Sequence, residues 1–412
     1  MPNHQAIFLP NDIDKQAIIL QTLSQKAPDV LAQFNELEGV LFSKIKIDEI
    51  LEEEDRHGFT EITKHLNRSL KSMSSGEQKK ALLNYILAQK VDFIILDNPF
   101  DNLDTATQTY LFNRIVELKD KILFIQIIHR KRDLLPFITQ IIRVENNNGK
   151  LTYHTDNETF TDNRDENILV GDIPATTHFY PEINDELIVF DKVNVSYNEK
   201  PILKDISWSI KKGEFWHLIG PNGAGKTTIL SMITGDNPKG YGQNLYLFGR
   251  KKGSGETVWD IKDKIGYVTP SMTDLFSTRH TLVQMVISGF YDSIGLYVNP
   301  SDLNVKIAKE WLALVNLSHL NDTLFCFLTS GQQRLSLILR AMVKHPPLLI
   351  LDEAIAGLDD HNAQLAISLI NKIANETNTT ILYVSHRSEE GLNPKNIFTL
   401  IPSEEGSEGI KS

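Results

Sequence analysis

Cysteine is almost absent from this chain of 412 residues, which contains one, Cys326. A single cysteine allows no internal disulfide and agrees with a reducing compartment. Cys326 lies in the apolar run 324–328, so we interpret it as a small core residue rather than a reactive thiol.

Long apolar runs and an excess of positive charge are also lacking. No stretch reaches the roughly 18 consecutive apolar residues of a membrane-spanning helix, and the start, Met1 to His4, has neither the basic nor the apolar region of a secretion signal. The formal net charge of −11 argues against an unspecific nucleic-acid binder. The apolar content of 41% is nevertheless sufficient for ordinary globular cores. The length favours about two to three domains.

The most informative stretch is a glycine-rich loop between a predicted strand at 215–219 and a predicted apolar helix at 229–233. Glycines let backbone N–H groups turn inward around a phosphate, and the helix dipole favours the same anion. In a GxxxxGK[ST] loop, Lys226 would contact the β- and γ-phosphates and the Thr227 hydroxyl would hold Mg²⁺. The predicted phosphate-binding residues are Gly220, Pro221, Asn222, Gly223, Ala224, Gly225, Lys226, Thr227 and Thr228.

The two halves of the chain repeat one series of segments. Each half contains a Ser-Gly signature, then an apolar strand that ends in aspartate, then a strand followed by histidine. The halves are offset by 255 residues at the signature glycine and the aspartate, and by 257 at the histidine. Chance does not produce this register, so the sequence indicates an internal duplication. The matching segments are 73–78 with 328–333, 93–98 with 348–353, 101–104 with 356–359, and 127–129 with 383–386.

Two acids and a histidine follow the apolar strands of the second half. Ligands of open α/β sheets bind beyond the carboxyl ends of the strands, so Asp352 can reach Mg²⁺ through water. Glu353 would then polarise the attacking water, and His386 would contact the γ-phosphate or orient that water. The alternative interpretation is a solvated strand end with a structural histidine.

Together, the phosphate loop, the signatures, the Asp-Glu strand end and the strand followed by histidine resemble the ABC ATPase module over almost the whole chain. Segments 195–198, 234–236, 249–257 and 288–295 further resemble tandem ABC ATPases of the ModF, or photorepair-protein, type, which is associated with molybdate transport. The resemblance implies ATP and Mg²⁺ as ligands, with Tyr197 stacked on the adenine ring. It assigns catalytic roles to Lys226, Glu353 and His386 and metal binding to Thr227 and Asp352.

The resemblance also implies an α/β fold of two tandem ABC ATPase (P-loop NTPase) modules. Each would have a parallel sheet core and a helical subdomain, and the second a small antiparallel sheet built from 187–210. We predict a shortened, degenerate first module at 1–144, a polar linker with one or two strands at 145–186, a complete module at 187–402 and a flexible tail at 403–412. The acidic run 52–55 is predicted to be the solvated face of a helix.

The first module departs furthest from the pattern. Its best copy of the phosphate loop is 10–16, after a strand at 6–9, unless the matching loop lies upstream of Met1. Asp12 and Asp14 replace glycines and set two negative charges against a phosphate, so we predict no working phosphate site here. In this alignment Pro10, Asn11 and Lys15 match Pro221, Asn222 and Lys226, whereas Gln16 replaces Thr227 and Asn98 replaces Glu353.

By resemblance, ABC modules pair head to tail, with each nucleotide between one module's phosphate loop and the other's signature. We therefore predict one competent site per chain, in which the second-module residues face Ser74, Gly76 and Glu77. A homodimer stays open. In the second module Pro270 stands where similar modules carry glutamine, so Ser271 or a solvent molecule would have to substitute.

Three function classes remain open. The protein could energise a membrane permease that docks on the helical region 276–327, as a cytoplasmic protein peripheral at the inner face of the membrane. It could instead be a soluble ABC ATPase in DNA repair or translation, or a nucleotide-gated clamp with little turnover. Translation factors of this type usually have two intact sites, and repair relatives carry zinc-binding cysteines; neither feature is present. No specific nucleic acid is indicated. We favour an ATPase with a permease partner and a molybdate-like anion as cargo.

Overall fold

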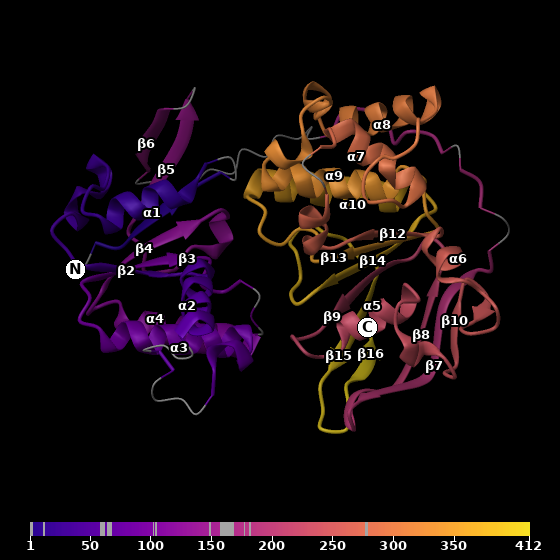
Figure 1. The fold of residues 1–412 in the computed structure, drawn as a ribbon, viewed down its shortest axis with the longest axis horizontal. Helices are drawn as coiled ribbons and strands as arrows, with labels where there is room; N and C mark the ends of the chain where they lie inside the picture. Colours follow the sequence, from indigo (N-terminus) through magenta and orange to yellow (C-terminus); the bar gives the residue numbers. More distant parts are fainter. Residues whose placement is uncertain are drawn as a thin grey trace. The chain divides into compact units, whose positions relative to one another are not determined.

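The computed structural model describes residues 3–10, 13–57, 62–63, 68–101, 103, 105–147, 150–156, 169–176, 178–180, 183–276 and 279–412. The chain divides into two compact units (Figure 1). The first consists of 1–163 with 357–360, and the second of 164–356 with 361–412.

The first unit is built on a six-stranded sheet in the order β2-β3-β4-β1-β5-β6. All neighbouring strands are parallel except β6, which runs antiparallel to β5. The central strands consist largely of Ile, Leu and Phe because helices cover both faces of the sheet. The strands are β1 (Gln5–Phe8), β2 (Gly39–Phe42), β3 (Phe93–Asp97), β4 (Leu123–Ile128), β5 (Gln140–Asn147) and β6 (Lys150–Asp156).

Helices form the outer layers of this unit. On one face, α1 (Lys15–Leu23) packs on the sheet through Ile18 and Ile19. On the other face lie α2 (Lys44–His57), α3 (Ser75–Ala88) and α4 (Thr105–Leu118), as Figure 1 shows.

The second unit repeats this sheet. Its order, β12-β13-β14-β9-β15-β16, corresponds strand by strand to that of the first unit, so the duplication predicted from the sequence is confirmed. A separate sheet, β11-β10-β7-β8, is the predicted antiparallel sheet. The strands are β7 (Glu186–Tyr197), β8 (Lys200–Lys211), β9 (Phe215–Ile219), β10 (Leu245–Leu247), β11 (Arg250–Lys251), β12 (Ile265–Val268), β13 (Leu348–Asp352), β14 (Thr380–Ser385), β15 (Asn396–Ile401) and β16 (Glu408–Lys411).

The helices of the second unit divide between the two faces of its parallel sheet. One core joins α5 and the antiparallel sheet to one face of the parallel sheet, while α9 and α10 cover the other face (Figure 1). A helical subdomain of α7, α8 and α9 packs beside β12. The helices are α5 (Lys226–Ile233), α6 (Val258–Lys262), α7 (Leu282–Ile287), α8 (Asp302–Leu314), α9 (Ser330–Met342) and α10 (Asp360–Glu376). Among the described residues, none of these helices has the length and hydropathy needed to cross a bilayer.

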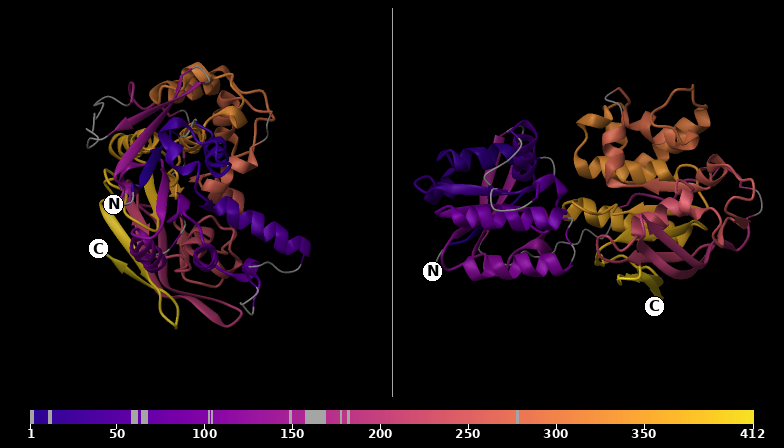
Figure 2. Two further views of the ribbon diagram at one scale, coloured as in Figure 1. Left: turned by 90° about the vertical axis from the view of Figure 1, so that its left-hand side faces the viewer. Right: turned by 60° about the horizontal axis from the view of Figure 1, so that its bottom comes forward.

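Two predicted boundaries need correction. Strands β5 and β6 carry the first unit past residue 144, because seven residue pairs between 141 and 156 join them as a hairpin. The predicted flexible tail forms β16, which pairs with β15 and ends the chain as a yellow hairpin in Figure 2. Much of the predicted linker, including 157–168, lies outside the described residues.

Two predictions of burial were also wrong. Cys326 is exposed, since it lies in a three-residue turn (Phe325–Phe327) of which only Phe325 faces the core. Within the acidic run, Glu52, Glu53 and Asp55 are exposed as expected, but Glu54 is buried. Its carboxylate accepts hydrogen bonds from the Ser69 hydroxyl at 2.9 Å and from the backbone N–H groups of residues 70 and 71.

We expect Glu54→Ala to destabilise the first unit by about 2–3 kcal/mol, because it removes the acceptor of the buried Leu70 N–H and of the part-buried donors of Ser69 and Lys71. Urea unfolding of the full chain measures this change. The matched substitution of its exposed neighbour, Glu53→Ala, should change stability by less than about 0.5 kcal/mol. Equal effects of the two substitutions would contradict the structural role of Glu54.

Candidate nucleotide site

The loop between β9 and α5 has the backbone geometry that phosphate binding requires. Gly223 and Gly225 have backbone φ angles of 81° and 93°, which residues other than glycine rarely adopt. A Cβ atom on Gly225 would also lie 2.6 Å from Leu203 of β8. Helix α5 begins directly at Lys226 and has no side-chain cap, so its first N–H groups remain directed at the loop.

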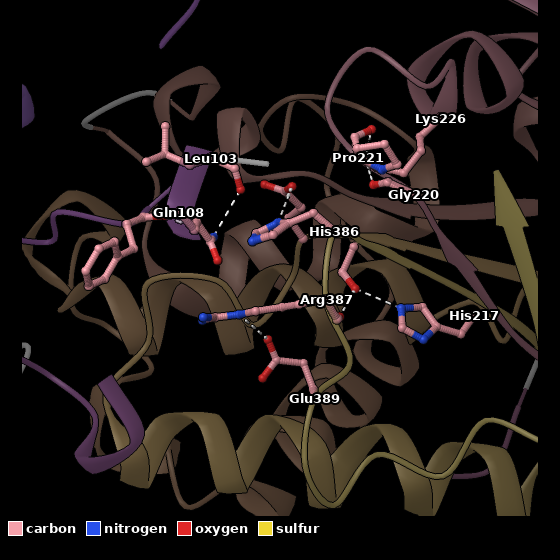
Figure 3. A network of polar contacts seen from close by, with 12 residues as sticks. Leu103, Gln108, His217, Gly220, Pro221, Lys226, His386, Arg387 and Glu389 are labelled. Carbon is pink, nitrogen blue, oxygen red and sulfur yellow. Dashed lines mark hydrogen bonds and ion pairs between the residues drawn. The ribbon is translucent and has the colours of Figure 1, made fainter. Parts of the chain in front are cut away.

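The Lys226 side chain folds back over the loop (Figure 3). Its Nζ donates to the carbonyl oxygens of Gly220 at 2.6 Å and Pro221 at 3.1 Å. An ammonium group has three donors, so one remains for a phosphate oxygen. Burial lowers the pKa of Lys226, while the charges of Glu353 and Asp352 oppose this shift. The lysine is therefore held at the loop by its own backbone before any nucleotide binds.

Two carboxylates and a histidine meet at the carboxyl ends of β13 and β14. Nδ1 of His386 lies 3.3 Å from Oε1 of Glu353, and this hydrogen bond lowers the pKa of Glu353. Burial and the charge of Glu353 raise the pKa of Asp352 to about 6, and Lys226 opposes the increase. At neutral pH both carboxylates are thus ionised, with Glu353 the stronger acid.

The backbone at Glu353 is in the left-handed region, with φ of 48°. Its N–H donates to the carbonyl of Val384 at 2.8 Å, which ties this turn to β14. Asn98, at the matching position of the first unit, has φ of 46°. Asparagine tolerates this conformation, whereas glutamate adopts it rarely, so the second unit retains strain where the carboxylate is placed.

Tyr197 and Pro270 lie in the same unit. Leu203 packs against Gly225, which brings the end of the β7–β8 hairpin, and with it Tyr197, to the phosphate loop. The Tyr197 ring is 40% exposed, and stacking on adenine stays a prediction. Pro270 begins a 3-10 turn, and the Ser271 hydroxyl lies 2.9 Å from that of Thr269.

In the first unit, carboxylates occupy the groups that correspond to the phosphate-binding groups of the second unit. Lys15, the first residue of α1, forms an ion pair at 2.8 Å with Asp97, which matches Asp352. The Asp14 carboxylate caps α1 by accepting from the N–H of Gln16 at 2.9 Å. The Asp97 carboxylate thus pairs with the lysine, and the Asp14 carboxylate accepts a hydrogen bond from a helix N–H group that a phosphate would otherwise use. Asn11 and Asp12 lie outside the described residues.

The first-unit signature forms the start of α3. The Ser74 side chain accepts from the Glu77 N–H, and the Glu77 carboxylate accepts from the Ser74 N–H at 2.9 Å, which is a capping box. These bonds and an ion pair with Arg68 lower the pKa of Glu77 to about 2. Glycine suits position 76, because a Cβ atom there would lie 3.0 Å from the Thr107 side chain of α4.

The donor set suits a magnesium ion. The Thr227 hydroxyl and the Asp352 carboxylate are oxygen ligands of the type that Mg²⁺ prefers, and such sites usually take their remaining ligands from phosphates and water. Among the described residues there is no group of three acidic, histidine or cysteine side chains that could hold a metal by themselves. Mg²⁺ bound here would neutralise charge that develops on the phosphates.

Sequence analysis missed three polar side chains of this region. His217 and Ser385 form a buried hydrogen bond. The Nε and Nη1 atoms of Arg334 in α9 are buried near the charge of Glu353 and have no hydrogen-bond partner among the described residues. A histidine within an apolar strand was the only available signal for the first pair.

Known proteins match the segment that carries the phosphate loop and the strand-end acids of this site. A family model described as ABC transporter matches residues 203–356, which include the phosphate loop and the Asp-Glu strand end. The ABC transporter ATP-binding protein ModF of Escherichia coli K12 is 40% identical over 347 residues, covering 80% of this chain and 69% of ModF. The chain belongs to the family of ABC transporter ATP-binding proteins.

The resemblance to ModF stated from the motifs is therefore confirmed, as are the fold class and the assignment as an ATPase. Two further relatives are similar to this ABC protein. An uncharacterized ABC transporter ATP-binding protein of Schizosaccharomyces pombe is 28% identical, covering 80% of this chain and 68% of its own length. The manganese transport system ATP-binding protein MntB of Bacillus subtilis is 30% identical, covering 48% of this chain and 76% of its own length.

Proposed function

We propose that this ABC protein hydrolyses ATP with Mg²⁺ at one site per chain, in the second unit, and that hydrolysis energises transport through a membrane permease. The contrast between Lys226 and Lys15 carries the first part. Within the part of the chain that the structure describes, Lys226 donates to two carbonyl oxygens and keeps a donor for phosphate, whereas Lys15 is neutralised by Asp97. One copy of the duplicated site can accept a nucleotide and the other is closed.

In the proposed reaction, Lys226 and the first N–H groups of α5 bind the β- and γ-phosphates. The Glu353 carboxylate accepts a hydrogen bond from the attacking water and takes its proton as the oxygen bonds to the γ-phosphorus. His386, hydrogen-bonded to Glu353 through Nδ1, directs that carboxylate, and in the doubly protonated imidazolium form its Nε2–H also donates to a γ-phosphate oxygen. Asp352 and Thr227 hold the metal ion.

The proposed permease surface is the helical subdomain. Tyr297 and Phe327 are 76% and 77% exposed, and Tyr291, Ile294, Val298 and Leu303 of the same subdomain are also exposed large apolar residues. Contiguous exposed apolar patches mark interaction surfaces in soluble folds, and these side chains supply apolar groups for such a surface on the helical subdomain. A transport role is also consistent with MntB, whose name refers to manganese transport. By resemblance the cargo is a molybdate-like anion.

By resemblance we also propose that Ser74, Gly76 and Glu77 complete the site from the first unit. The test measures ATP stoichiometry and phosphate release for the wild type and for Ser74→Arg. We expect one ATP per chain, and turnover lower by at least about 100-fold in Ser74→Arg, because a bulky cation replaces a hydroxyl at the γ-phosphate.

Ser72→Arg is the matched control, since Ser72 is an exposed serine two residues before Ser74 whose hydroxyl donates to the backbone carbonyl of Ser69. It should leave turnover within about threefold of the wild type. Two ATP molecules per chain would contradict the closed first site. Normal turnover of Ser74→Arg would exclude the first-unit signature from catalysis.

A further inference from the structure

His217 is a buried polar residue within the apolar strand β9. His217 is only 3% exposed. Its ring lies beside that of Tyr383 in the adjacent β14, with the two ring centres 5.4 Å apart. Nε2 of His217 lies 2.8 Å from the Ser385 hydroxyl oxygen (Figure 3). Burying a polar group costs free energy unless the group is hydrogen-bonded. The hydrogen bond to Ser385 offsets this cost for the His217 ring.

The direction of the hydrogen bonds can be assigned. The Ser385 hydroxyl donates its single hydrogen to the carbonyl oxygen of Arg387, at 2.5 Å. It must therefore accept from His217, whose ring carries its proton on Nε2. Burial lowers the pKa of His217 to about 4, and Glu389 is the charged group that opposes the shift. At neutral pH the ring is thus a neutral donor to Ser385.

The hydrogen bonds from His217 to Ser385 and from Ser385 to Arg387 form a relay whose last two residues flank His386 in the sequence. Ser385 and Arg387 are its two chain neighbours, so the bond between them fixes the turn by which His386 leaves β14. At the other end, β9 leads into the phosphate loop, and Ile219 pairs with Ser385 across the sheet. His217 therefore links the strand before the phosphate loop to the turn that carries His386.

We propose that His217 and Ser385 are positioning residues for ATP hydrolysis, which hold His386 in hydrogen-bonding distance of Glu353. The contact between His386 and Glu353 is 3.3 Å, near the upper limit for a hydrogen bond, so a small rotation of the turn breaks it. A displacement of about 1 Å in a catalytic group can lower a rate by about 100-fold. The inference rests on the proposed role of His386.

The test compares kcat, KM for ATP and thermal stability of the full chain in His217→Leu, Ser385→Ala and the conservative His217→Gln. We expect kcat to fall about tenfold in the first two, with KM within about twofold, because the substituted groups do not touch ATP. His217→Gln retains an N–H donor and should recover most of kcat. A merely structural role would lower stability without this separation of kcat from KM.

Thr380→Val is the matched control. Thr380 is a buried hydroxyl at the opposite end of β14, where it bonds to the carbonyl of Lys211 and to the N–H of Gly213. It should lower stability and leave kcat unchanged. A fall in kcat equal to that of His217→Leu would overturn the proposal.

The decisive measurement places His217→Leu in a His386→Ala background. If the relay acts through His386, the second substitution lowers kcat by less than about twofold, and an additional tenfold loss overturns the relay. Normal turnover of His386→Ala alone would overturn the proposed role of His386 and the inference with it. A strong loss in His386→Ala with none in His217→Leu would overturn the relay only.

Discussion

Replacing Glu353 by glutamine is expected to lower ATP turnover by about 10² to 10⁴-fold, the usual contribution of a general base. The amide keeps the size of the side chain and its hydrogen-bonding capacity, but it cannot take a proton from water. Binding should persist, because Lys226 and the backbone of the phosphate loop are unchanged. The substitution also removes a charge beside half-buried Asp352, whose pKa of about 6 partly reflects that charge.

Phosphate release at saturating ATP measures the rate, and equilibrium titration measures binding. The duplicated chain supplies a matched control in Asn98→Asp, which places a carboxylate at the equivalent strand end of the first unit. Turnover should not change, because Lys15 is already paired with Asp97 there. If Glu353→Gln retained turnover within about threefold of the wild type, another group would have to act as the base.

Lys226→Met is expected to weaken ATP binding by about 10 to 150-fold, which corresponds to about 1.5–3 kcal/mol for a charge-assisted hydrogen bond. Methionine has similar length and no charge, so the backbone of the loop should persist. Titration with a fluorescent ATP analogue measures the change.

Lys15→Met tests the closed copy by the same substitution. ATP affinity should be unchanged, while the first unit loses about 1–3 kcal/mol, because Asp97 is only 4% exposed and would lack its partner. The loss is discounted because the Lys15 side chain is 26% exposed. Weaker ATP binding in Lys15→Met would show that the first unit also takes nucleotide.

The sequence alone was sufficient for the parts that depend on short, local patterns. The strand before the phosphate loop was predicted at 215–219 and is found there. Its residues are apolar except for His217 and lie between a Lys-Gly-Glu turn and a glycine, a pattern typical of a buried parallel strand. The loop itself, the strand-end acids and the duplication follow from residue order at fixed spacing. These features identify the family without any knowledge of tertiary contacts.

Only the tertiary structure decided which distant side chains meet. Lys15 and Asp97 are 82 residues apart, and His217 and Ser385 are 168 residues apart. No periodicity connects such pairs, because their contact arises from the order of strands in a sheet rather than from spacing along the chain. The burial of Glu54, the exposure of Cys326 and the pairing of the final strand were decided in the same way. Sequence thus determined the chemistry that this ATPase carries and predicted that the first copy of the phosphate site does not work, while the fold added the contact between Lys15 and Asp97 that neutralises the first-unit lysine.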